Sequence, residues 1–220
     1  AVEMNAMQSS GNCVRNITAD QFAGRARDEI EDPRPWCELI RQWSILHPEF
    51  SYLPRKFKIA VSGAPSDRAA VKLHDVGLYL RRNADGVIGF EVLVGGGQGR
   101  LPYVGHTIRE WLAKEDLLSY LEAILRIYNL GGRRDNPQKA RIKVQVNALG
   151  PDEFRRLVDE EWAQIRNSPL LAVPGAEIER ITAYFADPAW EKLPDTPVAI
   201  AGQRKAEPAF DAWCGANVVE

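Results

Sequence analysis

Two strand-like segments joined by a short turn limit the fold of this chain more than any other feature. Residues 75–82 (DVGLYLRR) and 89–94 (GFEVLV) each have the pattern of a strand, and the Asn83-Ala84-Asp85-Gly86 turn between them is typical of a hairpin. Residues 56–62 (KFKIAVS) alternate polar and apolar side chains and predict a further strand. The centre of the fold should therefore be a sheet with antiparallel neighbours.

Other segments repeat apolar residues at helical spacing. The strongest is 114–130, which two glycines follow as a typical C-terminal cap; 36–46, 107–112 and 151–166 also predict helices. Residues 140–146 (ARIKVQV) alternate, so their period alone predicts a strand. Together these patterns predict an α+β protein, with a mixed or antiparallel sheet flanked by helices.

The composition changes after Ser168. Prolines recur at positions 169, 174, 188, 194, 197 and 208, and only residues 176–185 show a short helical pattern. We therefore expect residues 1–168 to form the folded body and residues 169–220 to form an extended, proline-rich arm. The chain does not begin with Met and its last segment has no stop signal, so we expect it to be part of a longer protein.

Charge and cysteine content exclude several classes of function. The chain has 28 Lys and Arg against 30 Asp and Glu, so its net charge of -2 does not predict binding to nucleic acids or to membranes. Its three cysteines, Cys13, Cys37 and Cys214, are too few and too widely spaced for a four-thiolate metal site. The N-terminus does not resemble a signal peptide, and no apolar run approaches the ~18 residues of a membrane span. These features favour the cytoplasm.

Cations gather in three segments that could bind an anion. Lys56 and Lys58 would project from the same face of a strand, ~6.5–7 Å apart. Five cations follow the predicted C-terminus of the 114–130 helix, in residues 133–143, and Arg15 lies in a polar turn. Lysines on a strand can also protect an exposed edge, and cations after a helix suit its dipole, so spacing alone leaves both interpretations open.

A glycine turn follows the second hairpin strand. Gly95, Gly96 and Gly97 could let a ligand approach the main chain, although a flexible turn explains them equally well. The segment lacks both the phosphate-binding lysine motif and the dinucleotide-binding spacing. The isolated residues His47, His74 and His106 show no metal-ligand spacing, and no nucleophile motif of a hydrolase occurs.

Four of these segments together resemble the nitrite/sulfite reductase hemoprotein family. Residues 12–16 (NCVRN), 52–58 (YLPRKFK), 93–97 (LVGGG) and 133–143 occur there in the same order and at the same intervals. The resemblance covers roughly residues 10–165, and LPRKFK followed by VGGG is its most specific part. It implies an enzyme with sirohaem and a [4Fe–4S] cluster that reduces sulfite to sulfide, or nitrite to ammonia, with six electrons.

The resemblance also implies roles for individual residues. The family's two active-site lysines fall on Lys56 and Lys58, and an active-site arginine falls on Arg15. Arg141 falls on a lysine position that pairs with a sirohaem carboxylate, which keeps the charge and changes the geometry. The full set of implied cofactor contacts is Arg55, Gly95, Gly96, Gly97, Arg133, Arg134 and Arg141. The family further places residues 140–146 on a helix, which we prefer to the strand predicted from their period.

This chemistry agrees with the cations. Sirohaem carries eight carboxylates, which an apolar pocket cannot hold without Arg and Lys partners. Sulfite and nitrite are small anions that nearby cations attract and stabilise. Their reduction consumes protons, and a lysine whose pKa is lowered by neighbouring cations can donate them.

The departures from the family suggest a fragment. The family's cluster ligands form two cysteine pairs that are absent here, so no metal ligand is predicted in this chain. A ferredoxin-like half that precedes this region in the family is also absent, and residues 169–220 would lead into a second such half. The implied partners are sulfite or nitrite, a ferredoxin or flavoprotein as electron donor, and the rest of the same polypeptide. The isolated chain should be inactive.

Two other functions stay open. The chain could be a non-catalytic module that binds an anion or a tetrapyrrole and lacks the redox half. It could also be a phosphate- or nucleotide-binding α+β domain that uses the turn at Gly97.

Overall fold

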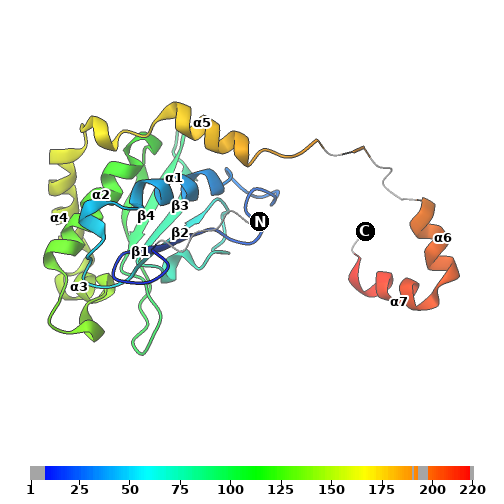
Figure 1. Ribbon diagram of the computed structural model, residues 1–220, viewed down its shortest axis with the longest axis horizontal. Helices are drawn as coiled ribbons and strands as arrows, with labels where there is room; N and C mark the ends of the chain where they lie inside the picture. The colour runs from blue at the N-terminus through cyan, green and yellow to red at the C-terminus, as the bar shows by residue number, and fades with distance from the viewer. Residues whose placement is uncertain (1–7, 190, 193–197, 219–220) are drawn as a thin grey trace. The chain divides into compact units, whose positions relative to one another are not determined.

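The computed structural model describes residues 8–189, 191–192 and 198–218. The chain divides into two compact units, Ala1–Phe185 and Ala186–Glu220. Figure 1 shows all labelled strands in the first unit and helices α6 and α7 in the second.

A five-stranded mixed sheet forms the centre of the first unit, in the order β1-β2-β3-β4-β5. Its strands are β1 (Val14–Thr18), β2 (Phe57–Ser62), β3 (Val76–Arg82), β4 (Ile88–Val94) and β5 (His106–Leu112). The pairs β1–β2 and β2–β3 are parallel, whereas β3–β4 and β4–β5 are antiparallel. The predicted α+β class, with a mixed sheet and a hairpin at residues 83–86, is confirmed.

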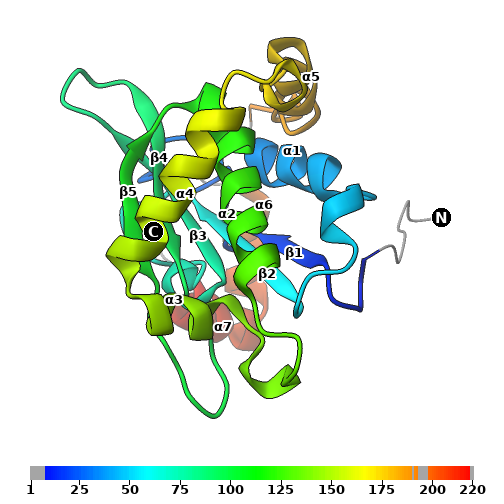
Figure 2. The same cartoon turned by 90° about the vertical axis from the view of Figure 1, so that its left-hand side faces the viewer.

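The helices of the first unit are α1 (Arg34–Ser44), α2 (Leu117–Gly131), α3 (Ile142–Leu149), α4 (Pro151–Ile165) and α5 (Gly175–Tyr184). Short 3-10 turns lie at Pro48–Phe50, Val71–Leu73, Lys114–Asp116, Pro137–Lys139 and Pro169–Leu171. Figure 2 shows α1, α2 and α4 on the same side of the sheet. Alternate strand residues such as Phe57, Ile59 and Val61 point to this side and form one core with the helices. Lys58, between two of them, therefore points to the opposite side.

The prediction of a helix at residues 107–112 is wrong, because this segment forms strand β5. Thr107 pairs with Leu93 and His106 pairs with Val94. Ile108 and Leu112 are buried and four residues apart, a spacing that shares one face in a helix and in a strand. The spacing of Ile108 and Leu112 therefore could not distinguish a helix from a strand. Strand β1, also in this sheet, was not predicted.

The strand predicted from the period of residues 140–146 is also wrong, because Ile142–Leu149 forms α3. The helix implied by the family resemblance is confirmed. Ile142 and Val146 are buried in the core, whereas Val144 is only half-buried. Buried residues at i and i+4 with a more exposed residue between them suit a helix packed on one face.

The first unit extends beyond residue 168, where the prolines suggested a boundary. Helix α5 packs against α1, Ile181 is buried, and Arg34 Nη2 donates to the Phe185 carbonyl at 3.3 Å.

In the second unit, α6 (Val198–Ala206) and α7 (Pro208–Asn217) are helical, so this part of the predicted arm is not extended. Pro208 occupies the first turn of α7, where proline starts a helix as readily as it ends one elsewhere. Pro194 and Pro197 of the predicted arm lie outside the described residues. Within the described part of the chain, no helix is long and apolar enough to cross a membrane.

Candidate functional site

The backbone brings together the first two segments that the sequence singled out. The Leu53 amide donates to the Asn12 carbonyl at 2.8 Å, and the Phe57 amide donates to the Cys13 carbonyl at 2.9 Å. Strand β1 then runs parallel to β2, with Asn16 opposite Lys58. Arg15 therefore lies beside the start of β2, where the lysines are.

Five cations share one electrostatic environment, which we call the cationic cluster: Arg15, Arg55, Lys56, Lys58 and Arg141. The pKa of Lys56 is lowered, first because burial disfavours its charged form and then because the other four cations repel its charge. Among the described residues, no acidic side chain forms an ion pair with Arg15, Lys56 or Lys58. The cluster is thus suited to receive an anion.

Asp75 connects this cluster to α3. Its side chain is fully buried just before β3, and Oδ1 accepts from Arg141 Nη2 at 2.6 Å and from Nε at 3.1 Å. Its Oδ2 accepts the backbone N–H of Lys58 at 3.0 Å. Burial raises the pKa of Asp75, and the adjacent Arg141 opposes that rise. Sequence reasoning missed this residue, although a lone acid at the start of an apolar strand was a usable signal.

The glycine turn also reaches Asp75, since the Gly95 amide donates to the Asp75 carbonyl at 3.0 Å. Gly95 has a φ of +81°, which favours glycine. A Cβ on Gly96 would lie 2.4 Å from the Lys72 carbonyl oxygen, and one on Gly97 would lie 3.0 Å from Arg141 Nη2. Contacts within the chain therefore leave little room for a side chain at any of the three glycines.

Lys143 holds the loop that follows this turn. The side chain is buried, and Nζ donates to the Gln98 carbonyl at 3.1 Å, to the Gly97 carbonyl at 3.4 Å and to the Leu101 carbonyl. Burial lowers the pKa of Lys143, and Arg141 lowers it further. The sequence did not assign a role to this lysine, which here fixes the loop beside the cationic cluster.

The structure places Arg133 and Arg134 apart from these contacts. Arg133 forms an exposed ion pair with Asp135 at 2.5 Å. Arg134 donates to Asn129 Oδ1 at 2.6 Å and to the Tyr52 carbonyl at 3.0 Å. Neither is among the cations that lower the pKa of Lys56.

The cysteines do not form a metal site in the described structure. Cys13 is buried and its Sγ donates to the Ser10 carbonyl at 3.3 Å, while burial raises the pKa of Cys37 to about 12. Cys214 lies in the second unit. No group of three or more His, Cys, Asp or Glu within the described ranges could hold a metal ion.

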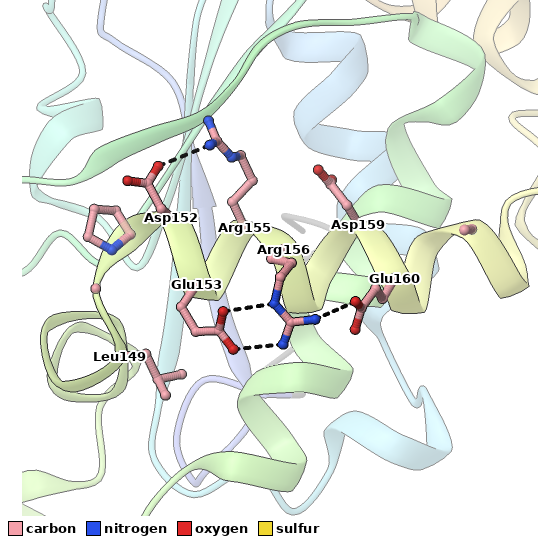
Figure 3. Close-up of a pocket in the computed structure, with 10 residues that line it drawn as sticks. Leu149, Asp152, Glu153, Arg155, Arg156, Asp159 and Glu160 are labelled. Atoms are coloured by element: carbon pink, nitrogen blue, oxygen red, sulfur yellow. Dashed lines mark hydrogen bonds and ion pairs between the residues drawn. The ribbon is translucent and has the colours of Figure 1, made fainter.

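A surface hollow of about 920 Å³ lies at the start of α4. Figure 3 shows its charged side chains, with Arg156 between Glu153 and Glu160 and with Arg155 paired to Asp152. None of the cationic-cluster residues lines this hollow. Because its arginines are already paired with acids, the cationic cluster is the better candidate for an anion site.

Residues 10–166 match the protein family described as the nitrite and sulphite reductase 4Fe-4S domain. The chain is 30% identical over 166 residues to sulfite reductase [ferredoxin] 1 of Mycolicibacterium paratuberculosis, covering 76% of this chain and 30% of that protein. It is 32% identical over 163 residues to the ferredoxin–nitrite reductase of Leptolyngbya laminosa, covering 72% of this chain and 32% of that protein. The chain thus spans about a third of the length of these relatives.

Solved structures give the same picture. The NirA protein of Mycobacterium tuberculosis aligns with a TM-score of 0.64 and 27% identity, over 76% of this chain and 30% of that protein. A dissimilatory sulfite reductase I structure aligns with a TM-score of 0.54 at 12% identity, over 90% of this chain and 62% of that one, which supports the fold alone.

Proposed function

Because the chain belongs to the nitrite and sulfite reductase family, we propose that it is the cofactor-facing part of a sirohaem-dependent assimilatory reductase. The complete enzyme would reduce sulfite to sulfide, or nitrite to ammonia, with six electrons. The observation that carries this proposal is the cationic cluster, in which the side chains of Arg15, Lys56 and Lys58 form no ion pair with an acid among the described residues.

The cluster has the chemistry that a polycarboxylate macrocycle needs. Four cations that the described acids leave uncompensated, Arg15, Arg55, Lys56 and Lys58, could pair with sirohaem carboxylates or with the substrate anion. We assign substrate contact to Arg15, Lys56 and Lys58, and cofactor contact to Arg55 and the Gly95–Gly97 turn. We keep Arg133, Arg134 and Arg141 as proposed cofactor contacts; to reach a sirohaem carboxylate, Arg133 would exchange its ion pair with Asp135 and Arg134 its bond to Asn129.

The lysines would also supply protons. A lowered pKa makes the Lys56 ammonium a better acid than an ordinary lysine, so it can release a proton from Nζ to a bound anion at lower cost. Lys58 and Arg15 would hold the same anion by charge and by hydrogen bonds. When bound, sirohaem supplies the iron that binds the substrate and carries the electrons.

The iron–sulfur cluster for which the family is named needs ligands from elsewhere. The described residues offer no suitable group of donors, so we place these ligands in the rest of the polypeptide. The relatives' names include ferredoxin, and we propose ferredoxin as the donor ahead of a flavoprotein. We also propose a cytoplasmic location.

The experiment is to express the full-length gene product with a sirohaem supply, then to record its absorption spectrum and its sulfite and nitrite reductase activity. Lys56→Ala and Lys58→Ala should each reduce turnover by about a hundredfold, the usual effect of removing a proton donor or charge from a transition state. Lys205→Ala, on an exposed part of α6, should leave turnover unchanged. A protein with neither a sirohaem spectrum nor reductase activity would overturn the proposal.

The second candidate is a non-catalytic module that binds an anion or a tetrapyrrole. It is favoured by one observation, the absence of a metal-ligand group from the described residues. The reading frame after residue 220 separates the two candidates: paired cysteines support the reductase, and a stop codon supports the module.

A further inference from the structure

Asp75 lies where three separate segments of the chain meet. Its carboxylate binds the Lys58 amide in β2 and the Arg141 guanidinium at the start of α3, while its carbonyl binds the Gly95 amide. Asp75 and Arg141 are 66 residues apart in sequence. We propose that Asp75 is a positioning residue that fixes Lys58 and Arg141 relative to each other for the anionic groups of the proposed reductase site, an inference that rests on the proposed function.

The hydrogen bonds use both carboxylate oxygens of Asp75. Arg141 donates to Oδ1 through Nε and Nη2, and the Lys58 amide donates to Oδ2. Three N–H donors aimed at two oxygens suit an ionised carboxylate, which only accepts. The remaining amino group of Arg141, Nη1, donates to the Gln98 carbonyl at 3.4 Å, so Asp75 and Gln98 together fix the orientation of the guanidinium.

Two roles for Asp75 can be separated because they predict opposite effects of removing its charge. As a mere neutraliser of Arg141, Asp75 would weaken anion binding, so losing its charge would strengthen binding. As a positioning residue, Asp75 improves anion binding. Removing its charge would then weaken anion binding, even though the cationic cluster becomes more positive. The arrangement favours the second role, because Asp75 also binds the uncharged Lys58 amide.

Asparagine at this position separates the roles cleanly. An amide of nearly the same shape has one acceptor oxygen and one donor nitrogen. It can accept from Arg141 or from the Lys58 amide, but whichever orientation it takes, its NH₂ group faces the other donor. Asp75→Asn should therefore release one of the two partners that the carboxylate holds together.

The first readout needs no ligand. In ¹⁵N NMR spectra of the 220-residue chain, the Arg141 Nε–H signal should be protected from exchange, unlike that of the exposed Arg155. Asp75→Asn should remove this protection or shift the Lys58 amide signal. An unprotected Arg141 Nε–H in the unsubstituted chain would overturn the proposal, and this measurement holds even if the variant does not fold.

The second readout is sirohaem binding by the full-length gene product, followed by absorbance titration. Asp75→Asn should weaken binding by roughly tenfold, the effect of one misplaced charge-assisted hydrogen bond. The matched control is Glu122→Gln, which removes another buried carboxylate, one that binds Arg126 and His47. This control should leave sirohaem affinity unchanged.

The outcomes are distinct. Tighter or unchanged sirohaem binding by a folded Asp75→Asn chain would overturn the positioning role. If the unsubstituted full-length protein bound no sirohaem, the proposed function would fail, whereas the NMR signals of the 220-residue chain would still decide whether Asp75 fixes Lys58 and Arg141.

Discussion

Gly96→Ala tests why the glycine turn is present. A Cβ at this position would lie 2.4 Å from the Lys72 carbonyl oxygen and 2.5 Å from the His74 carbonyl oxygen. Both are backbone atoms, so they cannot move aside as a side chain could. Overpacking a site of this kind costs ~1–3 kcal/mol, and because two carbonyls meet the same methyl group we expect about 3 kcal/mol.

The effect should be measured as a change in the thermal unfolding midpoint of the cofactor-free chain, followed by circular dichroism. For a chain of this length, a loss of 1 kcal/mol lowers the midpoint by ~2–4 °C, so 3 kcal/mol should lower it by about 6–12 °C. Gly175→Ala in α5 is the control, because a Cβ there meets no atom within 4 Å. The control should not lower the midpoint, since alanine favours a helix more than glycine does.

An unchanged midpoint for Gly96→Ala, together with lost sirohaem binding, would refute this reasoning. It would mean that a ligand needs the space at Gly96, whereas the Lys72 and His74 carbonyls leave room for a methyl group. The size of the midpoint change therefore distinguishes a packing role from a ligand-contact role.

Three further results are expected. Lys56→Gln should raise the thermal unfolding midpoint at pH 7, because the pKa of Lys56 is lowered in the folded state and its protonated form therefore opposes folding. The difference in midpoint should disappear at high pH, where Lys56 is neutral in the folded and the unfolded chain. In titrations with a thiol reagent at pH 8, half-buried Cys37 should react more slowly in the folded chain than after unfolding, because its surroundings raise the pKa of its thiol to about 12; equal rates would contradict this. Val146→Asp should unfold the chain at lower denaturant concentration than Val144→Asp, since only Val146 is buried; equal losses would contradict the α3 assignment.

The sequence predicted the parts of the sheet whose pattern is local. Strands β3 and β4 are short, strongly apolar runs joined by an Asn83-Ala84-Asp85-Gly86 turn, so neighbouring residues contained the information. Strand β1 did not show this pattern: it is short, and among its residues only Val14 is buried. It becomes a strand by pairing with β2, a contact that no local pattern reveals.

The candidate site shows a similar division. The residue types of the cationic cluster were recognisable in sequence, but their spatial grouping was not. Arg133 and Arg134 lie in the same cationic segment as Arg141, yet they bond to Asp135 and Asn129. Only Arg141 is at the start of α3, where the helix directs it toward Asp75.

The structure also explains how a group of like charges can be held together in a folded chain. The cluster's cations repel one another, so this arrangement needs support from elsewhere in the fold. Lys58 is flanked by Phe57 and Ile59, which are fully buried in the helix-covered core, and Asp75, just before β3, accepts a hydrogen bond from the Lys58 amide. The core thus fixes the backbone of β2 while the lysine side chain stays on the other face. A group of cations suited to an anion is therefore built on a strand whose opposite face is buried in the core, and this burial offsets the repulsion between the cations.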